Sequence, residues 1–220
     1  MVSCGFSNGE MAALNERHEG TNFVWTVNVS GITLRTDAKY FMPVKYKVQS
    51  VKNLYNLRYC TEMVAMDFGH YAVTDTSYLE YMPNLKYLLY FECPGLTDLS
   101  DVGKCTNLVY LELGQSRFID FWPLTNLTNL KDLNVCRMPF FDYLHIGEFG
   151  DITPFLQMTW LDRLWIAGNS LGKERRELLS EALSDTTLLF FSTGATNFGW
   201  RHSPQYYQQR DILEMPYFVH

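Results

Sequence analysis

Four stretches of the chain share one pattern of apolar residues: LKYLLYFEC (Leu85–Cys93), LVYLELGQS (Leu108–Ser116), LKDLNVCRM (Leu130–Met138) and LDRLWIAGN (Leu161–Asn169). An earlier stretch, MVAMDFGHY (Met63–Tyr71), follows the same pattern with substitutions. Apolar residues recur at the first, fourth and sixth positions, and the starts are 22, 23, 22 and 31 residues apart. A repeat of this length predicts a solenoid, in which each unit contributes one strand to a parallel sheet.

The residues before each start form a second half-repeat. An aspartate stands ten residues before the last four starts, and apolar residues stand six and three residues before them. Aspartate can cap the first N–H groups of a helical turn, so each unit should return through a short turn or helix whose apolar residues close the core. The aspartates are Asp75, Asp98, Asp120 and Asp151.

The units have irregular neighbours on both sides. A degenerate copy is set at Phe41, and Tyr143–Gly150 is interpreted as an insertion, either a tolerated surface loop or a loop on a binding face. Helical spacing over 172–183 precedes a last apolar strand at 187–192. We therefore expect one domain over 1–220, with an N-terminal cap at 1–40, repeats at 41–192 and a C-terminal cap at 193–220 that folds over the last strand.

Composition narrows the class of protein. The 220-residue chain is long enough for a large core, and its net charge of −6 argues against nucleic acid as the main partner. No apolar run reaches the length of a membrane span, and Met1–Gly20 lacks the apolar core of a signal peptide. The five cysteines form no C-x-x-C pair, so we expect no disulfide framework, with Cys60, Cys93 and Cys105 buried and Cys136 exposed.

The chain resembles the secreted or surface leucine-rich repeat proteins of gut Firmicutes (Clostridia). The stretches that carry the resemblance are LRTDAKYFMP (34–43), NLRYCTEM (56–63), YMPNLKYL (81–88), DLSDVGKCTNLVYLEL (98–113), DITPFLQMTWLDRLWIAGN (151–169) and the C-terminal GWR…YYQQRDILEMPY. The resemblance implies an α/β fold: a curved solenoid with a parallel sheet on its concave face, short turns or helices on its convex face, and capped ends. It also implies an exported protein that binds a partner.

One motif raises the possibility of an enzyme. Gly168–Gly172 matches G-x-S-x-G between a strand and a helix, which would make Ser170 a nucleophile with Asp185 or Asp211 and His202 or His220. The repeat explains the same residues more simply, because Asn169 falls on the ninth position of a unit and a strand-to-helix turn must follow it. The five histidines have no metal-ligand spacing. We therefore predict a protein without enzymatic activity, cofactor or metal.

The strand pattern selects candidate binding residues, because side chains between the core positions point to the concave face. These residues are Asp67, Tyr87, Leu89, Phe91, Tyr110, Glu112, Asp132, Asn134, Arg163 and Trp165, with His70, Glu92, Gln115 and Arg137 at the strand exits. Exposed aromatic residues and an arginine are typical of protein interfaces. We predict recognition of a protein or peptide, with carbohydrate stacking on the same aromatics as the alternative. A further alternative is that the C-terminal segment, or a second copy of the protein, covers these aromatics.

Overall fold

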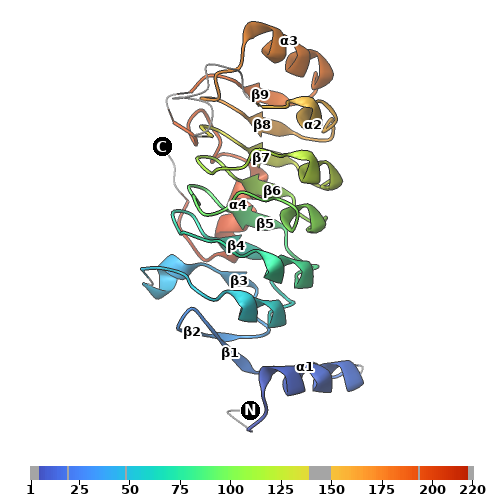
Figure 1. Ribbon diagram of the computed structural model, residues 1–220, viewed down its shortest axis with the longest axis vertical. Helices are drawn as coiled ribbons and strands as arrows, with labels where there is room; N and C mark the ends of the chain where they lie inside the picture. Colours follow the sequence, from blue (N-terminus) through green and yellow to red (C-terminus); the bar gives the residue numbers. More distant parts are fainter. Residues whose placement is uncertain (1–4, 19, 48, 139–149, 193, 218–220) are drawn as a thin grey trace.

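The computed structural model describes residues 5–18, 20–47, 49–138, 150–192 and 194–217. The chain begins with helix α1 (Asn8–Arg17) and a hairpin of β1 (Thr26–Val29) and β2 (Ile32–Arg35). Helix α1 begins where Ser7 and Glu10 form a reciprocal capping box, in which each side chain accepts the other's backbone N–H. These elements occupy the N-terminal end of the molecule (Figure 1).

Seven parallel strands then form one sheet in the order of the sequence (Figure 1). The fourth positions of four predicted units, Leu88, Leu111, Leu133 and Leu164, stand side by side in neighbouring strands. This register confirms the predicted repeat, and the fold is that of a leucine-rich repeat solenoid. The strands are β3 (Tyr40–Phe41), β4 (Ala65–Asp67), β5 (Tyr87–Leu89), β6 (Tyr110–Glu112), β7 (Asp132–Asn134), β8 (Arg163–Trp165) and β9 (Thr187–Leu189).

Each strand returns through a helical turn on the convex side of the sheet. The Oδ1 atoms of all four predicted capping aspartates accept a backbone N–H from two residues further on, at 2.8 to 2.9 Å. The aspartates therefore open these turns, but the predicted capping role is wrong: the N-cap residues of the helical turns that follow are Thr76, Asp101, Phe121 and Ile152, and none of them has a side-chain cap bond. The turns are the 3-10 helices η1 (Pro43–Tyr46), η2 (Tyr55–Tyr59), η3 (Ser77–Tyr81), η4 (Val102–Lys104) and η5 (Trp122–Asn126), and the α-helices α2 (Thr153–Leu156) and α3 (Lys173–Ala182).

An asparagine immediately before three of the repeat starts links neighbouring units. The Nδ2 atoms of Asn84, Asn107 and Asn129 donate to the backbone oxygens of Thr61, Pro83 and Thr106. In the next unit Trp160 takes this place, and its Nε1 donates to the oxygen of Leu127 at 2.9 Å. These bonds satisfy carbonyl groups at the turn-to-strand corners, so stacking of the units leaves fewer backbone acceptors without a partner.

The main core lies between the sheet and the convex turns, and it contains the leucine columns of the repeat. The predicted burial of Cys60, Cys93 and Cys105 is confirmed, and burial raises the pKa of each thiol to about 12. The expected exposure of Cys136 is wrong, because its side chain is fully buried on the concave side of the sheet. The four cysteines of the described residues are free thiols.

The first repeat lies in a different register from the predicted one. Phe41 pairs with Met66, the fourth position of its unit, so the unit begins near Ala38 and not at Phe41. Pro43 explains the error, because the strand stops before it and the apolar residues that follow belong to η1 and its exit. Of the predicted insertion Tyr143–Gly150, residues 143–149 lie outside the described residues.

The C-terminal segment 194–217, called the tail below, does not stay at the last strand: it packs against the concave face from β9 towards the N-terminal strands. Its helix α4 (Pro204–Ile212) lies across the concave face of the sheet, beside β4, β5 and β6 (Figure 1). Trp200, Tyr206 and Leu213 of the tail are buried there against apolar side chains of the strands. The strand face offers more apolar area than the edge of one last strand, so the tail buries more of its own aromatic residues in this position.

Candidate binding site on the concave face

Residues at the third and fifth positions of the repeat point to the concave side, as predicted. They form a second apolar cluster, separate from the main core, which the tail completes. Most of the ten predicted binding residues are buried within it, so their expected exposure is wrong. The buried members are Tyr87, Leu89, Tyr110, Glu112, Asp132, Asn134 and Trp165.

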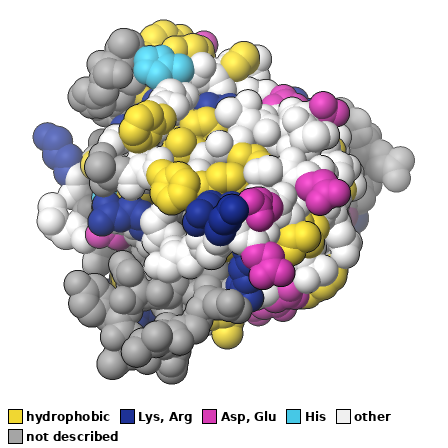
Figure 2. All heavy atoms as spheres, turned by 90° about the horizontal axis from the view of Figure 1, so that it is seen from above, with side chains coloured by type: hydrophobic (Ala, Val, Ile, Leu, Met, Phe, Trp, Pro, Cys, Tyr) yellow, Lys and Arg dark blue, Asp and Glu magenta, His cyan; other side chains and the backbone are white. Residues whose placement is uncertain are grey.

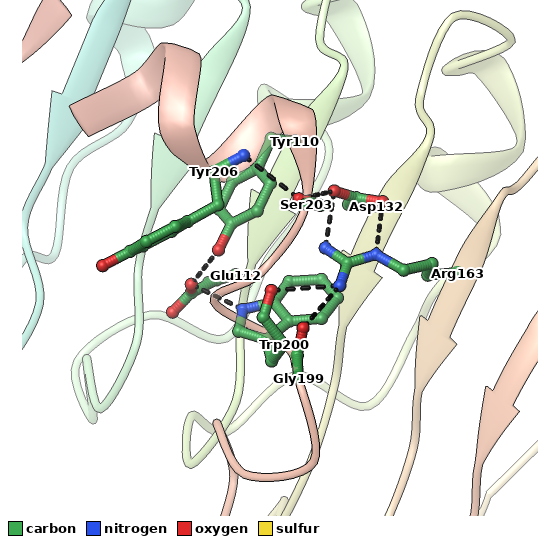
Figure 3. A network of polar contacts seen from close by, with 8 residues as sticks. All are labelled: Tyr110, Glu112, Asp132, Arg163, Gly199, Trp200, Ser203 and Tyr206. Carbon is green, nitrogen blue, oxygen red and sulfur yellow. Dashed lines mark hydrogen bonds and ion pairs between the residues drawn. The ribbon is translucent and has the colours of Figure 1, made fainter. Parts of the chain in front are cut away.

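Trp200 of the tail forms the centre of this contact (Figure 3). Its ring lies between those of Tyr110 and Trp165, with centroid distances of 5.2 and 5.3 Å. Its Nε1 donates to Glu112 Oε1 at 2.7 Å, and the Tyr110 hydroxyl donates to the same oxygen. The buried indole and carboxylate therefore satisfy each other, which is the condition for placing polar atoms in an apolar layer.

A buried ion pair fixes the tail beside Trp200 (Figure 3). Arg163 donates to both oxygens of Asp132, from Nε at 2.8 Å and from Nη2 at 2.7 Å. Its Nη1 donates to the backbone oxygens of Gly199 and Trp200, at 3.1 and 3.0 Å. Ser203, which caps α4, donates from Oγ to Asp132 at 2.7 Å. Two strand residues thus bind the tail backbone and the start of α4 in one network.

Further contacts follow the tail across the sheet. Four side chains of the strands bind tail atoms in order: Asn134 donates to the oxygen of Ala195, Trp165 to that of Asn197, Tyr87 to Oε1 of Gln208 and Tyr40 to Oε2 of Glu214. The tail therefore crosses from β7 and β8 towards β3. Seven predicted binding residues serve this contact, in agreement with the alternative that the tail covers them: Tyr87, Tyr110, Glu112, Asp132, Asn134, Arg163 and Trp165.

The tail leaves a cleft open on the N-terminal part of the concave face. This concave cleft has a volume of about 700 Å³ and is lined by residues of β4, β5, β6 and the tail, among them Asp67, Tyr71, Leu89, Phe91, Glu112 and Arg201. Four of these, Asp67, Leu89, Phe91 and Glu112, belong to the predicted binding residues. The sequence analysis missed Tyr71 and Arg201, since Tyr71 occupies a repeat position normally inside the core and Arg201 belongs to the tail.

Two carboxyl groups lie in the concave cleft. Asp67 accepts the backbone N–H of Gly69 at 2.9 Å, and Glu112 is held by Tyr110 and Trp200. Burial raises the pKa of both carboxyl groups, although these hydrogen bonds and the positive charge of Arg201 act in the opposite direction. Desolvation therefore outweighs the stabilisation that the surrounding groups give to the two negative charges.

The strand exits above the concave cleft have left-handed backbone. His70, Glu92, Gln115 and Arg137 have φ values of 68, 55, 58 and 54°. Each uses its backbone N–H to bond to the following unit, which holds this conformation in place. His70 also pairs with Glu92, with 2.7 Å between Nδ1 and Oε2, and its ring meets Phe91 edge-on at 5.9 Å. These contacts order the rim of the cleft.

The residues proposed for a serine nucleophile do not assemble in the described part of the chain. Ser170 lies in a turn with φ 48°, and no hydrogen bond among the described residues joins it to a histidine or an acid. His202 lies within hydrogen-bond distance of the Tyr207 hydroxyl, and Asp211 accepts from Tyr217, so both are engaged within the tail. His220 lies outside the described residues.

The end of the solenoid that carries α3 keeps an open apolar groove. It measures about 490 Å³ and is lined by Leu171, Phe190, Phe191 and Phe198, with Ser170 at its side. Figure 2, which looks onto this end, shows hydrophobic side chains among charged ones. Elsewhere in the described residues, no cluster of His, Cys, Asp and Glu is placed to hold a metal ion. None of the helices formed by these residues has the length and apolar character to cross a membrane.

No family model and no curated protein matches the chain. Among solved structures, it is similar to an internalin (InlF) of Listeria monocytogenes, at 24% identity and a TM-score of 0.49 over 66% of this chain and 46% of that one. It is also similar to an internalin C2 of the same species, at 14% identity and a TM-score of 0.49 over 68% of this chain and 73% of that one. A third similar structure is a leucine-rich repeat protein of Leptospira interrogans, at 13% identity and a TM-score of 0.45 over 64% of this chain and 40% of that one.

The chain thus spans less than half the length of two of these three proteins. Its classification as a leucine-rich repeat solenoid depends on its own strand register and repeat spacing, which are described above.

Proposed function

We propose that the protein is a binding module without enzymatic activity, which recognises a protein or peptide segment in the concave cleft. The observation that carries this proposal is a cleft of about 700 Å³ on the face where the repeat places its variable side chains. Its size falls within the roughly 300–1,000 Å³ typical of ligand sites, and it combines apolar walls with a few polar groups. Because Leu89 and Phe91 come from a rigid strand and its exit, this surface is ordered before a ligand arrives.

The resemblance of the sequence to secreted and surface leucine-rich repeat proteins supports an exported location for this binding module. The carbohydrate alternative loses support, because the aromatic residues on which it depended, Tyr87, Tyr110 and Trp165, are covered by the tail. We therefore retain the protein or peptide ligand. A glycan array probed with the purified protein would reverse this choice if it gave a strong and selective signal.

The test begins with a phage-displayed library of random peptides, selected on the purified full chain. Synthetic copies of the enriched peptides are titrated by calorimetry against the wild type, Phe91→Ala and the matched control Phe191→Ala. Phe91 lines the concave cleft, whereas Phe191 is 69% exposed in the groove at the α3 end. Loss of a central aromatic anchor should weaken binding by at least about 2 kcal/mol, and the control should bind like the wild type.

Two results would overturn the proposal. One is a selection that enriches no peptide above the background of an empty surface. The other is a set of peptides that bind wild type and Phe91→Ala equally well while circular dichroism shows both proteins folded.

A further inference from the structure

The polar groups of the concave cleft are not balanced in charge. Asp67 and Glu112 are the carboxyl groups among the residues that line it, and Arg201 is the guanidinium group that acts electrostatically on both. Lys47 lines the outer part of the cleft and is exposed, so water screens its charge. His70 also lines it, but its ring is paired with Glu92 at the rim. Among the lining residues, the inner part of the cleft therefore holds two acids against one arginine, and the buried Arg210 of α4 adds a second positive charge that acts on Asp67.

Asp67 has the geometry to receive a positively charged group. It lies at the end of β4, and its Oδ1 accepts one backbone N–H, from Gly69. Arg201 and Arg210 influence it through their charge, but no hydrogen bond in the described residues joins either guanidinium group to the Asp67 carboxylate. Among the described residues, no protein donor bonds to its second oxygen, which a ligand can therefore use. A partly buried carboxylate of this kind gains from a charge-assisted hydrogen bond.

The walls beside Asp67 suit the stem of a long cationic side chain. Tyr71 and Phe91 contribute aromatic surface, and Leu89 contributes an aliphatic floor. Lysine and arginine carry an apolar stem below the charged head, and both are attracted to aromatic faces. An acidic group would meet the carboxyl groups of Asp67 and Glu112, and the arginines that act on them already serve these two acids: Arg201 acts on both and Arg210 on Asp67.

We propose that the concave cleft binds a lysine or arginine side chain of the partner, with Asp67 as its counter-ion and Tyr71 and Phe91 as the walls along its stem. This inference rests on the proposed function and names the partner as a peptide or protein that presents a basic side chain. Glu112, fixed by Tyr110 and Trp200, adds negative potential beneath the same site.

The probe is a combinatorial nonapeptide library with one fixed central residue, prepared with lysine, arginine, norleucine or glutamate. Binding of each sublibrary to the immobilised full chain is measured by surface plasmon resonance at physiological salt. Lysine and arginine sublibraries should bind about 10- to 100-fold more strongly than norleucine, the range that one hydrogen bond to a charged group supplies.

Two substitutions test the acids without changing the shape of the cleft. Asp67→Asn keeps an oxygen for the N–H of Gly69, and Glu112→Gln keeps one for Tyr110 and Trp200. Asp67→Asn should remove most of the preference for basic residues, and Glu112→Gln should reduce it less. Glu92→Gln is the control, because it removes a negative charge from the exposed rim and leaves the inner cleft intact.

The outcomes separate this inference from the proposed function. Peptides that bind in the cleft, lose affinity in Phe91→Ala and show no preference for lysine or arginine would overturn the inference and leave the function standing. A basic preference that survives in folded Asp67→Asn, or falls equally in Glu92→Gln, would also overturn it. If Asp67→Asn does not fold, the comparison of Glu112→Gln with Glu92→Gln decides, and equal effects contradict the proposal. Absence of binding by every sublibrary contradicts the function itself.

Discussion

Replacing Arg163 by methionine tests whether the tail is fixed by a buried ion pair. The side chain of Asp132 is 1% exposed and that of Arg163 is 13% exposed. The substitution removes two hydrogen bonds to Asp132 and two to backbone oxygens of Gly199 and Trp200. Asp132 would retain the hydroxyl of Ser203, but its charge would lie in an apolar layer without a cation.

The expected loss follows from this burial. Breaking a buried pair by removing one partner costs about 3–5 kcal/mol, mainly because the remaining charge is desolvated and uncompensated. The chain offers a matched comparison in Arg35 and Asp37, which form the same two-bond arrangement at 2.9 and 2.7 Å on the surface. Water and salt screen that exposed pair, so Arg35→Met should cost less than about 1 kcal/mol.

The assay is urea denaturation, followed by far-ultraviolet circular dichroism and tryptophan fluorescence, for wild type, Arg163→Met and Arg35→Met. A double variant, Arg163→Met with Asp132→Leu, replaces the pair by apolar side chains and should be more stable than Arg163→Met alone, because no buried charge remains. Equal losses in Arg163→Met and Arg35→Met, or a double variant less stable than the single one, would refute the reasoning.

Four further outcomes follow from burial on the two faces of the sheet. Trp200→Ala should lower the free energy of unfolding by about 3–5 kcal/mol in urea titrations, and a loss below about 1 kcal/mol would contradict its central position. Gln209→Leu should raise that free energy by about 1–3 kcal/mol, because the buried amide of Gln209 has no hydrogen-bond partner among the residues that the structure describes; a destabilised variant would refute this. Cys60 and Cys105 should react with a thiol reagent only after urea is added, and rapid labelling of the native protein, monitored by mass spectrometry, would contradict their burial. The raised pKa of Glu112 stabilises the fold at low pH, and this contribution is lost as pH rises from the ordinary glutamate value of 4.5 through the raised folded-state value, so Glu112→Gln should lose less stability than wild type over this rise; identical slopes would refute it.

The repeat itself could be predicted from the sequence because its signals are local and periodic. The leucine columns and the turn-opening aspartates recur at fixed offsets, and each offset has one physical explanation in every unit. The asparagine column of Asn84, Asn107 and Asn129 was equally visible in the sequence, one residue before each start. A recurring amide at a turn-to-strand corner is a typical partner for backbone carbonyls, so this column too has a physical explanation that the sequence alone could supply.

The position of the tail could not be predicted by the same argument. Nothing periodic relates residues 199–217 to the strands, and their apolar content suits any uncovered surface, whether a solenoid end or a sheet face. The register near Phe41 failed for a related reason. Two strand residues followed by Pro43 give too short a pattern to distinguish neighbouring alignments, and only pairing with β4 selects one of them.

The strand residues themselves contained the evidence that a cover was needed. Tyr87, Leu89, Tyr110 and Trp165 would form a large contiguous apolar surface on a single-sided sheet, which monomeric proteins rarely leave open. The same positions carry Asp132 and Arg163, whose buried charges require partners in the covering segment. The tail meets both requirements, since Trp200 fills the aromatic part and its backbone oxygen, with Ser203, serves the charged part. A surface with this mixture is explained by a specific cover within the chain, and the proposed recognition of another molecule is then confined to the part of the face that the cover does not reach.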